Sequence, residues 1–167
     1  QKLLDKPEQP VAIMLPAWDE SAVIRPMLMN TLRTLAYGNY HVFVGTYPND
    51  KDTQREVDEV CAISDRVHKV VTADPGPTCK ADCLNWIYSG IRNYERESGI
   101  EFQIFVMQDC EDVIHPLCYR IFNWLIPRKD MVQLPVLSLA RKWHEFTASH
   151  YIDEFAQLHN KDMVVRE

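Results

Sequence analysis

The sequence predicts an α/β fold, with a mostly parallel sheet and helices on both of its faces. Short apolar segments, each long enough for one buried strand, alternate with longer segments of helical periodicity. Polar clusters follow the apolar segments, as expected where parallel strands end at a ligand-binding edge. The resulting β-α-β-α-β-α-β order over residues 11–108 implies right-handed crossovers that place helices on both faces.

The order of the elements follows from the apolar segments and the residues that separate them. Strands are expected at residues 11–15, 40–46, 67–72 and 101–108. Helices are expected at residues 20–36, at 52–64 and at 80–97. Pro26 should kink the first helix or mark its start, and Asp52 or Thr53 can cap the second. Thr78 should cap the third helix and Gly99 end it. A helix over 115–128, a strand over 131–137 and a helix over 143–159 complete the prediction.

Composition limits the classes of protein to consider. The 167 residues are enough for a single domain over 1–167, which we expect to be a piece of a longer protein truncated at its C-terminus. A net charge of −6 without a basic stripe argues against nucleic acid as a partner. The five cysteines have no zinc spacing and suggest free thiols in a reducing compartment. No apolar run reaches the ~20 residues that span a bilayer.

The fourth apolar segment ends in three acids within four positions, Asp109, Glu111 and Asp112. Alternation places Asp109 and Glu111 on one side, with Cys110 facing away. Two neighbouring carboxylates repel unless a cation lies between them, and a hard divalent cation that also touches phosphates fits such a pair. The alternative is a solvated acidic turn.

Other strand ends add polar groups that should meet at the same edge of the sheet. Lys80 begins a helix, where free N–H groups favour an anion, although it could be a solvated lysine. Trp18 could stack on a base or belong to the core. Asp19 and Glu20 could bind a ligand or simply favour the positive start of the first helix.

These motifs, taken in order, resemble the family 2 glycosyltransferases. The matching segments are Pro16-Ala17-Trp18-Asp19-Glu20, Asn49-Asp50-Lys51-Asp52-Thr53, Lys80-Ala81-Asp82-Cys83-Leu84-Asn85 and Asp109-Cys110-Glu111-Asp112. Each motif is weak alone, but their order and spacing are specific. The resemblance implies a GT-A (Rossmann-like) fold and a UDP-sugar donor bound with a divalent metal, Mn or Mg.

The resemblance also implies roles for particular residues. The metal would be held by Asp109 and Glu111, and Lys80 would help to neutralise the diphosphate. Glu20 and Asp50 would contact the nucleobase or ribose. The full donor-binding set implied in this way is Pro16, Ala17, Trp18, Asp19, Glu20, Asp50, Lys80 and Asp109.

The chain departs from the family pattern in ways that bear on activity. Asp82 replaces the usual glycine of the lysine segment, and Asn49 stands where many members have an aspartate. No Thr-Glu-Asp motif occurs, so the catalytic base is expected beyond Glu167 and this chain alone to be inactive. The resemblance implies transfer of the sugar by inversion to a glycan or lipid acceptor in polysaccharide biosynthesis, at the cytoplasmic face of the bacterial inner membrane. Asp153 and Glu154 are expected to be surface residues of a helix.

Two other readings remain open. Acids at a strand end also serve metal-dependent phosphatases and nucleotidyltransferases. However, Asp19 lies awkwardly for a nucleophile, and no glycine-rich loop follows the first strand. A nonenzymatic, metal-binding module of flavodoxin-like shape would show the same acidic strand ends. Metal-dependent binding of UDP would separate such a module from a glycosyltransferase.

Overall fold

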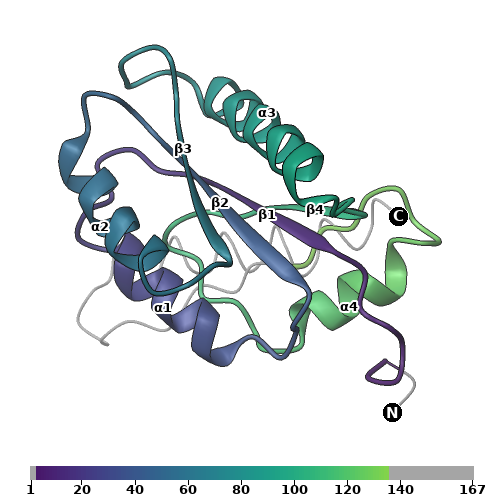
Figure 1. Ribbon diagram of the computed structural model, residues 1–167. Helices are drawn as coiled ribbons and strands as arrows, with labels where there is room; N and C mark the ends of the chain where they lie inside the picture. Colours follow the sequence, from purple (N-terminus) through teal and green to yellow (C-terminus); the bar gives the residue numbers. More distant parts are fainter. Residues whose placement is uncertain (1–2, 136–167) are drawn as a thin grey trace, which may run out of the picture. The chain divides into compact units, whose positions relative to one another are not determined.

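The computed structural model describes residues 3–135 of the chain (Figure 1). The chain divides into two compact units, residues 1–130 and 131–167, and the helices and strands described below belong to the first. The single domain expected over residues 1–167 stays a prediction.

Four parallel strands form the sheet of the described residues, in the order β3-β2-β1-β4. Their bounds are β1 (Val11–Pro16), β2 (Tyr40–Thr46), β3 (Val67–Val71) and β4 (Ile104–Met107). In β1, Val11 pairs with Tyr40 on one side and with Ile104 on the other. β1 is buried from Val11 to Leu15, as its continuous apolar run predicts for an inner parallel strand.

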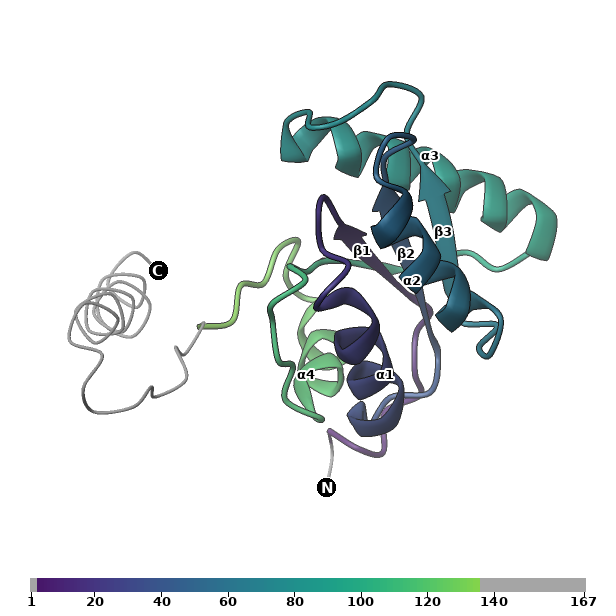
Figure 2. The same ribbon diagram turned by 90° about the vertical axis from the view of Figure 1, so that its left-hand side faces the viewer.

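Helices cover both faces of this sheet (Figure 2). α1 (Ile24–Thr34) and α2 (Lys51–Cys61) pack against each other on one face, and α3 (Lys80–Ser98) packs against β1 and β2 on the other. The core under α3 consists of Ala12, Met14, Phe43, Tyr47, Cys83, Ile87, Ile91 and Phe102. The predicted α/β fold, with a parallel sheet and helices on both faces, is confirmed.

The first helix is shorter than the expected range of residues 20–36. The backbone carbonyl of Glu20 accepts hydrogen bonds from Val23 N at 3.0 Å and Ile24 N at 2.9 Å, so a turn precedes α1. Pro26 is then the third residue of α1, where its missing N–H has no helical partner to lose. Pro26 therefore marks the start of the helix, which is one of the two expected outcomes.

The caps of α2 and α3 differ from the predicted ones. Asp50, rather than Asp52 or Thr53, caps α2 by accepting a hydrogen bond from Thr53 N. The N-cap of α3 is Cys79 instead of Thr78, because the Thr78 hydroxyl bonds the Tyr47 hydroxyl at 2.9 Å. Gly99 ends α3 as predicted, with a left-handed φ of 74° that suits glycine.

The later elements agree only in part with the prediction. α4 (Cys118–Leu125) lies within the expected 115–128 helix, and no strand forms over residues 131–135. Residues 136–137 of that expected strand lie outside the described residues, as does the expected 143–159 helix. β4 is shorter than the expected 101–108 strand because its approach is tied elsewhere: Phe102 N donates to buried Glu95 Oε1 at 2.9 Å.

The N-terminal lead-in before β1 is fixed by polar contacts from distant parts of the chain. Gln9 N donates to Asn123 Oδ1 at 3.1 Å, and Asn123 Nδ2 donates to Pro7 O at 3.0 Å. Glu8 Oε2 accepts from Gly38 N at 2.7 Å. These bonds attach the lead-in to α4 and to the turn before β2. Within residues 3–135, no helix has the length and apolar character needed to cross a membrane.

Candidate functional site

A cavity of about 300 Å³ opens at the carboxyl edge of the sheet. Its lining comes from the segments that follow β1, β2 and β4 and from the start of α3: Pro16, Ala17, Trp18, Glu20, Tyr47, Thr78, Lys80, Asp109, Cys110 and Glu111. From β1 the chain proceeds to β2 and β3 on one side, and α3 then returns it to β4 on the other side. The cavity thus lies at the topological switch point between β1 and β4, where open α/β sheets bind ligands.

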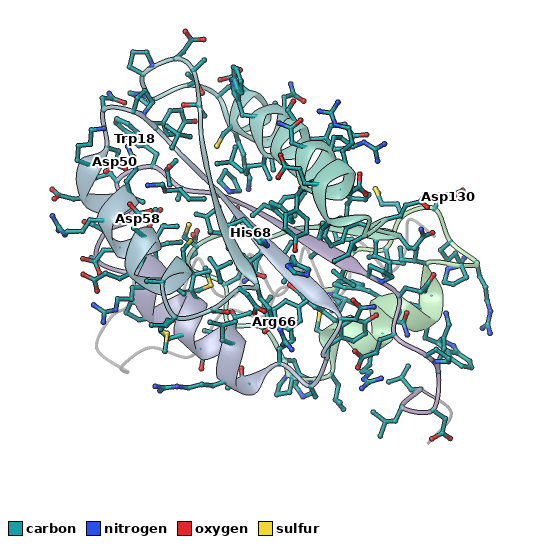
Figure 3. The ribbon with its side chains drawn as sticks, in the orientation of Figure 1. Trp18, Asp50, Asp58, Arg66, His68 and Asp130 are labelled. Carbon is teal, nitrogen blue, oxygen red and sulfur yellow. The ribbon has the colours of Figure 1, made fainter. Side chains whose placement is uncertain are left out.

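The segments after β1 and β2 are joined at this edge. Asp19 N donates to Asp50 Oδ2 at 2.7 Å, and Glu20 N donates to Thr53 Oγ1 at 3.0 Å. Asp19 has a φ of 56°, a left-handed conformation that aspartate tolerates better than most residues. Figure 3 shows Trp18 and Asp50 near one another at the end of the sheet away from His68. Asp19 and Asp50 thus hold the edge of the site in shape.

Lys80 meets the acids across the cavity. Its ammonium forms an ion pair with Asp109, and both side chains are about half exposed, at 54% and 46%. Lys80 is the first residue of α3, where the free N–H groups and the helix dipole add positive potential. A cationic group therefore faces the carboxylates that follow β4.

Two carboxyl groups of this edge, those of Glu20 and Asp112, have a raised pKa. Burial raises the pKa of Glu20, with further contributions from Glu111, Asp19, Asp109 and Asp50 in that order. Burial also raises the pKa of Asp112, although Asp112 accepts a hydrogen bond from Asp109 N. Negative charge is thus concentrated around the cavity, and a cation there would relieve the repulsion.

Cys110 does not face away from the site, so that prediction is wrong. Cys110 lines the cavity and is 3% exposed, and its thiol donates to Pro16 O at 3.5 Å. The alternation fails because β4 ends at Met107 and residues 110–111 form a turn. Burial, with Glu20 and Glu111 nearby, raises the pKa of the Cys110 thiol to about 12. The thiol therefore stays protonated near neutral pH and is no nucleophile.

Trp18 packs against the core, which is one of the two roles that the sequence left open, and stacking on a base stays a prediction. Its ring packs edge-on against Tyr47, with 5.2 Å between centroids, and lies against the core under α3. It also lines the cavity. Trp18 and Tyr47 form the aromatic floor of the cavity. Because both rings also pack in the core under α3, the core fixes the position of this floor.

Most of the predicted site residues meet in this cavity. Those that line it are Pro16, Ala17, Trp18, Glu20, Lys80, Asp109 and Glu111. Asp19 and Asp50 lie at its edge and are joined by a hydrogen bond. Sequence reasoning missed Tyr47 and Thr78, although Tyr47 directly follows β2 and Thr78 comes two residues before Lys80. Asp153 and Glu154 lie outside the described residues.

The carboxylates of the cavity suit a metal ion whose coordination shell is completed by the substrate. Asp109 and Glu111 supply hard oxygen ligands in one cavity. Among residues 3–135, however, no three His, Cys, Asp or Glu side chains come close enough to hold a metal ion by themselves. Mg²⁺ and similar ions often use one or two carboxylates, with water and substrate phosphates completing the shell. Asp109 and Glu111 fit that arrangement as candidate protein ligands.

The fold and the family match together place the chain in the glycosyltransferase class. The chain belongs to the family described as glycosyltransferase like family 2, whose model matches residues 7–167. It is 54% identical over all 167 residues to bacteriophage adsorption protein B of Escherichia coli strain K12 and to bacteriophage N4 adsorption protein B of Escherichia coli O157:H7. The chain spans 22% of the length of each of these relatives.

A solved structure supports the same fold. The mannosyltransferase PcManGT from Pyrobaculum calidifontis, in complex with GDP-Man and Mn²⁺, matches with a TM-score of 0.54 at 17% identity. The match covers 88% of this chain and 42% of that one. At this identity the likeness shows the fold alone, and it confirms the expected GT-A architecture.

Proposed function

We propose that this chain is the donor-binding part of an inverting glycosyltransferase that uses a UDP-sugar. The observation that carries the proposal is the cavity in which Lys80 faces Asp109 and Glu111 at the switch point of the sheet. A diphosphate with a bound cation matches this arrangement of one ammonium and several carboxylates. Membership of the glycosyltransferase family supports this reading over the phosphatase and flavodoxin-like alternatives.

Each group would have a distinct task in binding the donor. Asp109 and Glu111 would hold a divalent cation, Mn or Mg, which when bound neutralises the diphosphate leaving group. Lys80 would leave Asp109 and place its ammonium on a phosphate oxygen. Trp18 and Tyr47 offer apolar surface for the nucleoside, while Glu20 and Asp50 can accept hydrogen bonds from its base or ribose.

The acceptor and the catalytic base belong to the rest of the protein in this proposal. The base would be a carboxylate beyond Glu167 that activates a hydroxyl of a glycan or lipid. Direct attack on the anomeric carbon would then invert its configuration. Membrane segments outside this chain would place the domain at the cytoplasmic face of the bacterial inner membrane, and the chain alone would transfer no sugar.

Titration calorimetry tests the proposal on the whole chain. We expect UDP to bind when Mn²⁺ or Mg²⁺ is present and to bind weakly without it. Glu111→Gln removes one metal ligand and should weaken UDP binding by on the order of 1–3 kcal/mol, the range for a lost charged contact. GDP belongs in the same experiment, because the solved neighbour was studied with GDP-Man and Mn²⁺.

The matched control is Glu101→Gln, which neutralises an exposed glutamate just before β4, at the opposite edge of the sheet. It changes the net charge by the same amount and should bind UDP like the parent. If Glu111→Gln also binds UDP and metal like the parent, the metal assignment is wrong. If the parent binds no nucleoside diphosphate with either metal, the donor-binding proposal itself is wrong.

A further inference from the structure

Asn49 forms a two-point contact between loops that are 27 positions apart in the chain. Its Nδ2 donates to Gly76 O at 2.8 Å, and its Oδ1 accepts from Gly76 N at 2.8 Å. One side-chain amide thus satisfies both backbone groups of a single residue. The contact joins the turn after β2 to the loop between β3 and α3.

This contact needs a side chain that both donates and accepts. Asparagine offers an N–H₂ and a carbonyl oxygen in one plane, whereas an ionised aspartate only accepts. An aspartate at position 49 would keep the bond from Gly76 N but would set a charged oxygen against Gly76 O. The geometry therefore distinguishes asparagine from an isosteric carboxylate.

Gly76 is held against the aromatic floor of the cavity. A Cβ added at Gly76 would lie 2.5 Å from the Trp18 ring and 2.7 Å from the Tyr47 ring. The backbone of the loop therefore lies directly on these two rings. Farther along the loop, the Thr78 hydroxyl bonds the Tyr47 hydroxyl at 2.9 Å, and Lys80 begins α3.

Asn49 does not line the cavity, but three residues that do lie next to its contact. Trp18 and Tyr47 lie against Gly76, and Thr78 follows two residues later. We propose that Asn49 is a positioning residue: by holding Gly76 it fixes the loop over residues 74–79 as one wall of the donor cavity. The inference rests on the proposed donor-binding function and extends it to a residue outside the cavity.

Nucleotide binding to Asn49 variants tests this inference. Asn49→Ala loses both bonds and should bind UDP with Mn²⁺, or GDP with Mn²⁺, roughly fivefold or more weakly, since two hydrogen bonds of ordinary strength are removed. The control is Asn30→Ala, which removes an exposed amide from α1 and should bind like the parent. Thermal melts of all variants confirm that each is folded.

Asn49→Asp gives a signature that a purely steric role would not produce. At about pH 7.5 the carboxylate is ionised and should bind nucleotide more weakly than the parent, despite its equal size. As the pH falls toward about 4, near the ordinary pKa of aspartate, protonation restores a donor, and affinity relative to the parent at the same pH should rise. Asn49→Ala should show no such rise. An Asn49→Asp variant that equals the parent at about pH 7.5 overturns the inference.

Amide hydrogen exchange separates failure of this inference from failure of the proposed function. Asn49→Ala should speed exchange at Gly76 in the absence of nucleotide, because its N–H loses Asn49 Oδ1. If the parent binds no nucleoside diphosphate, the proposed function and the inference fall together. If the parent binds and Asn49→Ala binds equally well, or if exchange at Gly76 is no faster in Asn49→Ala than in the parent, only the inference is overturned.

Discussion

At the scale of single residues, Asp50 shows how closely folding and binding are joined at this edge. Its Oδ1 accepts from Thr53 N at 3.2 Å and its Oδ2 accepts from Asp19 N at 2.7 Å. Each carboxylate oxygen can still accept a second bond, so a contact to base or ribose remains open. Truncating Asp50 would remove an N-cap and a link between two loops as well as any ligand contact. Glu111, which is exposed, is therefore the cleaner probe of donor binding.

Ionised Glu20 should lower the stability of the fold and strengthen binding of the nucleotide. Burial and the neighbouring carboxylates raise its pKa above the ordinary 4.5, so ionised Glu20 destabilises the fold. Glu20→Gln should raise the free energy of unfolding at neutral pH, by less than about 1 kcal/mol because water screens the group, and the melting temperature should rise with it. The same variant should bind UDP with Mn²⁺ more weakly than the parent. Melts and titrations of one preparation measure both effects.

The pH dependence distinguishes this explanation from a general change in packing. A raised pKa gives stability that is complete below pH 4.5 and is lost as the pH rises through the folded-state pKa. The advantage of Glu20→Gln should therefore vanish toward pH 4.5 and grow above it. Glu101→Gln, at an exposed site, should show no such trend. An advantage that stays constant with pH would contradict the electrostatic origin.

At the scale of elements, the sequence predicts what local patterns decide. The apolar runs predict the positions of the four strands. The helix predicted to start at Lys80 and to end before Gly99 is α3, with those same limits. Most of the cavity residues were also predictable, because the carboxyl ends of parallel strands meet at one edge. These predictions depend only on periodicity, capping and the direction of the chain.

What the sequence could not predict depends on partners from distant segments. Threonine is a favoured N-cap residue, but the hydroxyl of Thr78 bonds the Tyr47 hydroxyl and does not cap α3. Cys110 would face away from Asp109 and Glu111 only if β4 continued to it, because side chains alternate between the faces of a strand. β4 ends at Met107, three residues earlier. Tyr47 enters the site because Trp18 packs on it. In each case a tertiary contact, invisible to local periodicity, decides the outcome.

The junction between α3 and β4 should depend on the buried carboxylate of Glu95. Glu95 is 8% exposed, and its Oε1 accepts from Phe102 N at 2.9 Å. Glu95→Ala leaves this buried N–H without a partner and should lower the free energy of unfolding by about 1–3 kcal/mol. Glu95→Gln keeps an acceptor oxygen and should cost less. Urea unfolding of the two variants measures the difference.

Glu97→Ala is the matched control for this junction, because Glu97 is an exposed glutamate on the same helix. Its unfolding free energy should stay within about 0.5 kcal/mol of the parent, as is usual at exposed sites. A Glu95→Ala variant as stable as Glu97→Ala would show that Phe102 N finds water in place of the carboxylate.

At the scale of the whole molecule, the sheet keeps its ligand edge apart from a histidine pair on its α3 face. His41 Nδ1 and His68 Nε2 are 2.9 Å apart on neighbouring strands. The His68 ring stacks on Phe43, with 4.8 Å between centroids, and lies 4.4 Å from the Tyr94 ring of α3. Figure 3 shows His68 well away from Trp18 and Asp50. The pair therefore bears on stability and not on the cavity.

This histidine pair should make the fold sensitive to mild acid. Burial, and then the neighbouring His41, lower the pKa of His68 from 6.5 to about 4, against an opposing effect of Asp65. Burial also lowers the pKa of His41, with Arg66 adding to it and Asp65 opposing it. The unfolded chain then binds protons more readily, so stability is present above pH 6.5 and is lost as the pH falls toward 4. After allowance for solvent screening, we expect a loss on the order of 1–2 kcal/mol.

Unfolding in urea across this pH range, for the parent and for His68→Gln, measures the effect. Glutamine can place a donor near the position of Nε2 but does not titrate, so its stability curve should be flatter than that of the parent. Glu20 and Asp112 contribute the opposite trend, since their raised pKa values favour the folded chain in acid. That contribution is common to both proteins and cancels in their difference. If His68→Gln follows the parent curve, the acid sensitivity arises elsewhere in the chain.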